Sequence, residues 1–141
     1  MVRMIVGSRG TGKTKRLIQM VNHAGETSKG NVVCIEQGDA LRYDIGYNIR
    51  LINIQEYYIQ GIDAYSGFVA GLLAGNYDIT EIYADATFKI LCGQDQKDFE
   101  VLADFIQKLE ELTAHTEACV YLTVSCDVSD IPERIRQYIM E

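Results

Sequence analysis

The chain has 141 residues, and its 20 acidic and 13 basic residues give a formal net charge of −7. This length suits a single domain, expected over residues 1–141, that buries roughly two-thirds of its unfolded surface. The acidic balance argues against a protein that grips nucleic acid or an anionic membrane through a broad basic face. No apolar run approaches the ~20 residues that span a bilayer, and the N-terminus resembles a strand rather than a signal peptide, so a cytoplasmic location is expected.

The predicted elements alternate between strands and helices. Apolar runs predict strands over residues 1–6, 31–36, 49–54, 81–86 and 118–124. Helical patterns and capping residues predict helices that begin near Lys13, Asp63, Asp95 and Asp130. Strands separated by helices form βαβ units, so we expect an α/β fold of three layers, with a mainly parallel five-stranded sheet and helices on both faces. In such a sheet a ligand belongs at the carboxyl ends of the strands.

A phosphate-binding motif follows the first predicted strand. Residues 6–14 read VGSRGTGKT and satisfy every fixed position of the pattern G-x-x-x-x-G-K-[ST], through Gly7, Gly12, Lys13 and Thr14. These four choices would coincide somewhere in a chain of this length about one time in a hundred. The motif also has the context that it requires, a strand before it and a helical pattern after it. The pattern therefore predicts a P-loop that binds a nucleoside triphosphate.

The residue types in the motif fit this chemistry. Glycines leave the backbone free to turn successive N–H groups into one concavity, and the positive end of the next helix adds to the field there. Lys13 is expected along the β- and γ-phosphates, and the Thr14 hydroxyl on Mg²⁺. The predicted nucleotide-binding residues are Gly7, Ser8, Arg9, Gly10, Thr11, Gly12, Lys13 and Thr14.

Two other strand ends compete to supply the acid that a P-loop enzyme uses at its metal. Asp85 follows an apolar run in IYADA, which is the simple form of the Walker B pattern. Glu56 follows Gln55 at the end of the strand LINI. The sequence leaves open which of the two is the functional equivalent. We expect Thr14 and Asp85 as metal ligands, and Lys13 and Glu56 as catalytic residues.

Five successive segments resemble the core of type II thymidine kinases, which is a RecA-like P-loop NTPase fold. They are VGSRGTGKT, EQGDALRY, INIQEYY, EIYADATFKI and LADFIQKLEELTAHTEACVYL, and together they span most of residues 1–125. The resemblance implies that Glu56 is the general base, that Gln55 replaces a metal-associated Asp, and that Asp85 and Phe88 match a D-G-T-F-like block. The zinc-binding cysteine pairs and the lasso over the thymidine base are missing. The chain is also similar to small bacterial proteins described as ATP-binding, some labelled twitching-motility ATPases.

Three hypotheses of function follow. In the first, an enzyme binds Mg-ATP at residues 7–14 and passes the γ-phosphoryl group to water or to a small acceptor. In the second, a regulatory module holds nucleotide with negligible turnover, which Gln55 and the missing lid favour. In the third, a motor-like subunit forms a homo-oligomer in which Arg9 or Arg134 acts in trans. ATP is preferred to GTP because the family implies it and no N-K-x-D signature appears. No membrane or nucleic-acid partner is expected, and the acceptor is left open.

Overall fold

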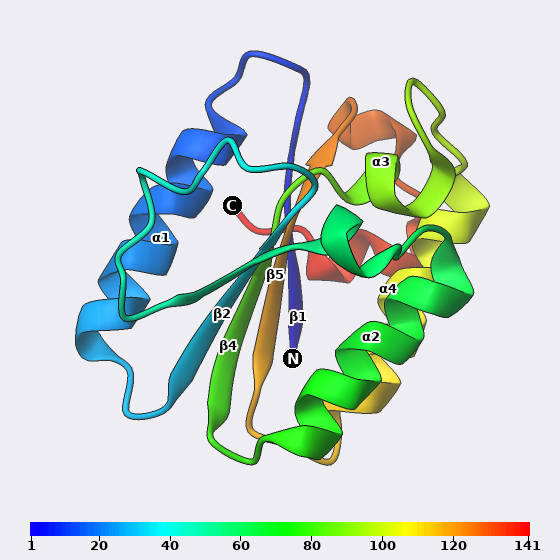
Figure 1. Cartoon of the computed structure of the whole chain (residues 1–141). Coiled ribbons are helices and arrows are strands. Elements are labelled where there is room, and N and C mark those ends of the chain that lie inside the picture. Colours follow the sequence, from blue (N-terminus) through cyan, green and yellow to red (C-terminus); the bar gives the residue numbers. More distant parts are fainter.

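The computed structural model describes all 141 residues and contains one five-stranded sheet (Figure 1). The strands are β1 (Val2–Gly7), β2 (Asn31–Glu36), β3 (Arg50–Asn53), β4 (Ile79–Ala84) and β5 (Cys119–Ser125). Every neighbouring pair is parallel, and the strand order is β1-β5-β4-β2-β3. The prediction of a parallel five-stranded sheet in an α/β fold is confirmed. In this order β1 and β3 lie at opposite edges, and β5 separates β1 from β4.

Helices cover both faces of the sheet. The helices are α1 (Lys13–Thr27), α2 (Ile62–Gly75), α3 (Thr87–Cys92) and α4 (Phe99–Thr113), and short 3₁₀ turns occur at Ile54–Tyr57, Val128–Asp130 and Glu133–Tyr138. Figure 1 shows α1 on one face and α2 with α4 on the other. None of these helices combines the length and the apolar character that crossing a membrane requires.

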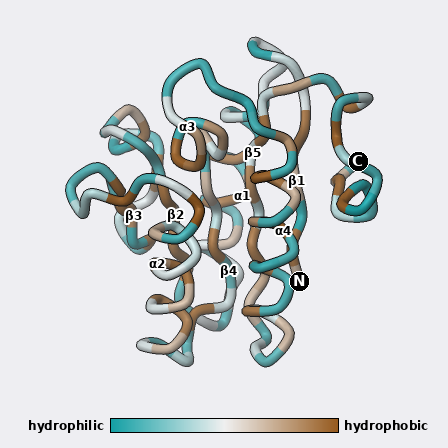
Figure 2. Tube along the Cα trace, turned by 90° about the vertical axis from the view of Figure 1, so that its right-hand side faces the viewer, coloured by the Kyte–Doolittle hydropathy of each residue, from teal (hydrophilic) through white to brown (hydrophobic).

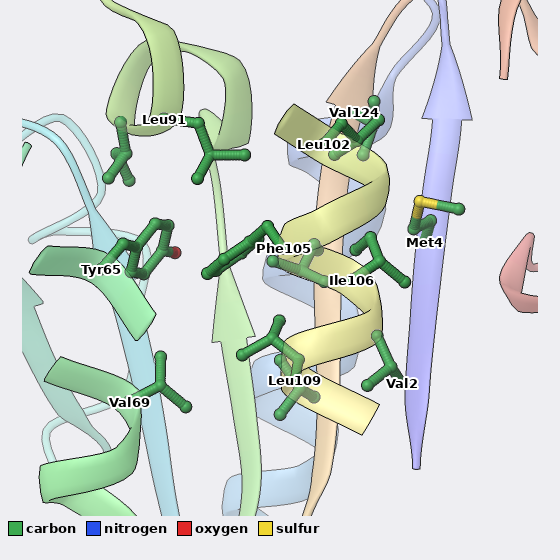
Figure 3. Packing of buried hydrophobic residues seen from close by; sticks show 14 of the residues in the cluster. Val2, Met4, Tyr65, Val69, Leu91, Leu102, Phe105, Ile106, Leu109 and Val124 are labelled. Atoms are coloured by element: carbon green, nitrogen blue, oxygen red, sulfur yellow. The ribbon is translucent and has the colours of Figure 1, made fainter. Parts of the chain in front are cut away.

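Two apolar cores hold the helices to the sheet. On the α1 face, Leu17 and Val21 pack in one cluster with strand residues such as Cys34. On the other face Phe105 of α4 is fully buried, and its ring stacks on that of Tyr65 with 4.6 Å between centroids (Figure 3). Each such side chain contributes roughly 1.5–3 kcal/mol through its burial. Along α4 hydrophobic and hydrophilic residues alternate with the turns of the helix, as predicted for an element with one face on the core (Figure 2).

The segment between β4 and α4 differs from the sequence prediction. The strand expected over 81–86 ends at Ala84, and Ala86 has a left-handed backbone with φ of 58°, which turns the chain into the unpredicted helix α3. The next helix begins at its cap Asp98, which accepts hydrogen bonds from two N–H groups of the first turn, and not at Asp95. Asp98 is the cap residue because its side chain reaches those N–H groups, whereas Asp95 has a left-handed backbone with φ of 59°.

Two other predicted helix starts are also corrected. Asp63 lies inside the first turn of α2 and makes no capping hydrogen bond, because Gly61 occupies the cap position with φ of 90°. The helix expected from Asp130 is replaced by two 3₁₀ turns. Pro132 separates them, since it has no N–H to donate and holds an extended backbone with ψ of 142°. After these turns, Ile139 forms an isolated parallel bridge with β1.

Candidate functional site

The glycine-rich loop, residues 7–14, connects the carboxyl end of β1 to the first turn of α1. Gly10 and Gly12 have φ of 84° and 85°, a left-handed conformation that glycine adopts without strain. At Gly7 an added Cβ would lie 2.6 Å from the hydroxyl oxygen of Thr11, whose hydroxyl closes the loop by donating to a backbone carbonyl at 2.7 Å. Backbone conformation therefore favours glycine at Gly12, and at Gly7 any side chain would displace the Thr11 hydroxyl from its contact.

The first turn of α1 presents backbone N–H groups that have no acceptor within the helix. The helix has no side-chain cap, and its first hydrogen bond runs from the Arg16 N–H to the Gly12 carbonyl at 3.0 Å. The N–H groups of Lys13, Thr14 and Lys15 precede this bond and cannot join the helical ladder. The turn also contains two lysines and no acidic side chain, which opposes the helix dipole. An anion held at this turn would accept from the N–H groups and offset the unfavourable charges.

Asp85 lies at the centre of a hydroxyl network that joins the first turn of α1, the end of β4 and β5. The Thr14 hydroxyl lies 3.4 and 3.3 Å from the two carboxylate oxygens of Asp85 and donates to them. Thr123 on β5 donates to the same carboxylate at 2.5 Å, and its oxygen accepts from the Ala86 N–H at 3.2 Å. The structure thus brings Thr14, which follows β1, close to Asp85, which follows β4, although β5 lies between these two strands. Thr123 is a partner that the sequence reasoning missed.

Lys13 is surrounded by charges from several elements. Its ammonium group donates to the Ser8 carbonyl at 2.9 Å. Burial lowers the pKa of Lys13, the charge of Asp85 raises it, and the charge of Lys97 lowers it further. Lys13 therefore lies within electrostatic reach of the predicted metal ligand and of a second lysine, which comes from the loop after α3.

A pocket of about 880 Å³ opens between the glycine-rich loop and α3. Its volume lies in the range of small-molecule sites, and it lies at the carboxyl ends of the parallel strands. Five cations and two carboxylates line it, and they are Arg9, Lys13, Lys15, Lys89, Lys97, Asp85 and Asp95. Positive charge is thus concentrated here in a chain whose net charge is −7. Such a field favours a polyanionic ligand.

The predicted nucleotide-binding residues divide into two groups in the structure. The residues that line the pocket are Arg9, Gly10, Gly12, Lys13 and Thr14. Gly7, Ser8 and Thr11 do not line it, but the Ser8 carbonyl accepts hydrogen bonds from both the backbone and the side chain of Thr11 and from Lys13. Gly7, Ser8 and Thr11 therefore shape the loop.

Glu56 does not reach this pocket. It is an exposed residue of the 3₁₀ turn after β3, and β3 is the edge strand opposite β1. Four inter-strand spacings separate the two edges, which amounts to roughly 19 Å. Glu56 was predicted as the general base because the resemblance to type II thymidine kinases implies that role. Glu56 and Gln55 follow β3, which is four positions from β1 and two positions from β4 in the sheet, and neither lines the pocket that contains Lys13 and Asp85. The geometry therefore does not support a catalytic role for Glu56.

Two arginines that could have acted on a bound phosphate are also held elsewhere. Arg134 pairs with Glu100 and Asp104 of α4, with 2.9 Å between the charged atoms of each pair. Arg136 donates to the Ser129 carbonyl at 2.9 Å. Neither arginine lines the pocket. Arg134 instead ties the C-terminal turns to α4, and Arg136 connects the two turns to each other.

Glu36 is a buried acid that the sequence reasoning assigned only to a strand. It ends β2 and is 4% exposed; its Oε1 accepts from the Leu41 N–H at 3.1 Å, while its Oε2 is buried without a partner. Burial raises the pKa of Glu36, and the charges of Asp39 and Asp85 raise it further, against the lowering effect of the Leu41 N–H. The sequence signal was available, because Glu36 ends a buried strand just as Asp85 follows one.

No known family model matches this sequence, and a comparison with curated proteins finds no match. Function is therefore inferred from the fold, the motif and the pocket. Together they define an α/β protein with a cationic cavity at the carboxyl ends of parallel strands, where a glycine-rich loop, a helix N-terminus and a threonine–aspartate pair meet.

Proposed function

We propose that the protein is a P-loop NTPase that binds Mg-ATP in this pocket and transfers the γ-phosphoryl group to water or to a small acceptor. One observation carries the proposal: the free N–H groups at the start of α1, Lys13 and the Thr14–Asp85 pair all border a single cationic cavity. A triphosphate requires N–H donors and a lysine, and its magnesium ion requires oxygen ligands. The lining of the pocket includes groups of each kind, namely the first turn of α1, Lys13, Thr14 and Asp85, and this supports the proposal.

The polyphosphate chain would be held by the chain's own donors. The N–H groups of the first turn of α1 would donate to phosphate oxygens, and Lys13 would exchange its contact with the Ser8 carbonyl for a contact with the β- and γ-phosphates. Because these contacts use the phosphates alone, the preference for adenine rests on the family resemblance.

The residues around Thr14 fit a magnesium ion that arrives with the nucleotide. Mg²⁺ prefers oxygen ligands, keeps several waters and uses one or two carboxylates plus phosphates; once bound, it neutralises charge on the phosphates. The Thr14 hydroxyl and the Asp85 carboxylate supply one neutral and one anionic oxygen donor. The protein has no group of three or more His, Cys, Asp or Glu side chains that could hold a metal by themselves. Such a donor set suits a shared metal site.

A second candidate function is a nucleotide-binding module with slow turnover, and the carboxylates of the pocket favour it. Only Asp85 and Asp95 line the cavity, and Asp85 already accepts hydrogen bonds from Thr14 and Thr123. Glu56 lies at the far edge of the sheet. A strong general base for the attacking nucleophile is therefore not in place beside Lys13.

The two candidates are separated by binding and turnover measured on the same samples. Purified protein would be titrated calorimetrically with ATP, GTP and a non-hydrolysable ATP analogue, with and without Mg²⁺, and phosphate release would then be followed. Tight Mg-dependent binding with steady release supports the enzyme, and tight binding without release supports the module. Absence of binding to all three nucleotides would refute both. Specific activity that falls on dilution would indicate a site shared between subunits of an oligomer.

We also propose a cytoplasmic location. All four cysteines are free, and two of them, Cys34 and Cys126, are buried. Free thiols persist in reducing compartments, where ATP is also the abundant nucleotide triphosphate that such a pocket would meet.

A further inference from the structure

The wall of the pocket opposite the glycine-rich loop contains a lysine whose backbone is held at both sides. Lys97 lines the cavity from the short loop between α3 and α4. Gly93 ends α3 with φ of 93°, and Asp98 caps α4 directly after Lys97. Phe88 of α3 packs edge-on against Phe99 of α4, with 5.3 Å between ring centroids. Because both ends of this loop are held, the backbone of Lys97 is positioned before any ligand binds.

Figure 1 shows this loop (yellow-green) and the glycine-rich loop (dark blue) at the same end of the sheet. The charge of Lys97 lowers the pKa of Lys13, so the two cations are within electrostatic reach of each other. Neither has a carboxylate partner, since the ion pairs of this protein involve only Arg42, Arg134 and Arg136. Two unpaired lysines on facing parts of one pocket repel each other, and an anion between them would relieve that repulsion.

We propose that Lys97 contacts the terminal phosphoryl group of the bound nucleotide from the side opposite the glycine-rich loop, and so makes the pocket selective for a triphosphate over a diphosphate. This inference rests on the proposed function, because it requires the phosphates to lie along residues 7–14. The N–H groups of α1 and Lys13 would hold the inner face of the phosphate chain. Lys97 would supply a cation to the oxygens of the last phosphate, which the inner donors leave exposed.

The neighbouring charges leave this role to Lys97. Lys89 lines the same wall but belongs to α3, whereas Lys97 belongs to the loop after α3, and its charge lowers the pKa of Lys13. Asp95 is the one carboxylate of the same loop that lines the cavity. It makes no ion pair with Lys97. The lysine therefore stays available to a phosphate.

The test compares two nucleotides that differ by one phosphate. Dissociation constants for Mg-ATP and Mg-ADP would be measured for the wild-type protein, Lys97→Ala and Lys97→Arg, with circular dichroism to confirm that each variant folds. Lys97→Ala is expected to weaken Mg-ATP binding about tenfold and Mg-ADP binding less than about twofold. Lys97→Arg is expected to restore most of the preference. Lys108→Ala, an exposed lysine of α4 outside the pocket, controls for the loss of one positive charge and is expected to change neither constant.

The other outcomes are distinct. If Lys97→Ala weakens both nucleotides equally, or leaves both unchanged, this inference is overturned while the proposed function stands; unchanged binding would mean that Lys97 serves the phosphate of a second substrate or no ligand. If the wild-type protein binds neither nucleotide, the proposed function fails and this inference fails with it.

Discussion

Replacing Lys13 by alanine removes the cation closest to the predicted β- and γ-phosphates. A hydrogen bond to a charged group contributes about 1.5–3 kcal/mol, and 1.4 kcal/mol corresponds to a factor of ten, so Mg-ATP affinity should fall about 10- to 150-fold. The free energy of unfolding should fall little, because the ammonium group makes one exposed hydrogen bond, to the Ser8 carbonyl at 2.9 Å. Removing Lys13 also ends its repulsion with Lys97, and this offsets part of the loss of stability.

The assay pairs calorimetric titration of Lys13→Ala with thermal unfolding of the same sample. We expect the melting temperature to change by a few degrees at most, while nucleotide binding falls at least tenfold. Lys108→Ala, which removes an exposed lysine of α4, serves as the control for net charge. A folded Lys13→Ala protein that binds Mg-ATP as tightly as the wild type would refute the placement of the phosphates along the glycine-rich loop.

Three further predictions concern carboxylates. Asp85→Asn should keep metal-free ATP binding but lose about tenfold of the affinity gained with Mg²⁺, measured by titration with and without the ion; an unchanged gain would remove Asp85 from the metal site. Because the folded protein raises the pKa of Glu36 above its ordinary 4.5, the carboxyl stabilises the fold below that pH and loses this contribution as pH rises through the raised pKa. Glu36→Gln should remove that part of the pH dependence in urea unfolding, and an identical pH profile would contradict it. Glu56→Gln should leave binding and phosphate release unchanged, and a loss of release would restore the general-base hypothesis drawn from the family resemblance.

The sequence was most informative where chemistry is local. The glycine-rich motif needs only a strand, a loop and a helix that follow one another directly, so residues 7–14 and their context could be predicted from one continuous stretch of sequence. The regular alternation of buried strands with helical patterns likewise implied a parallel sheet, because parallel strands must be joined by crossovers. Short elements were less predictable. The helix α3 follows a left-handed Ala86, and no side-chain pattern in the sequence predicts that conformation.

Strand order was decided only by the tertiary structure, and it determined the site. Every buried parallel strand has a similar apolar sequence, so nothing local states which strand pairs with which. The actual order moves Glu56 to the far edge, brings Asp85 to Thr14 across the end of β5, and places Glu36 beside the strand that leads to Asp85. The sequence by itself determined that this chain has the residue pattern G-x-x-x-x-G-K-[ST] between a strand and a helix. Long-range packing decided that Asp85, Asp95 and Lys97 line the same pocket as this loop, because these segments meet only once the sheet has formed.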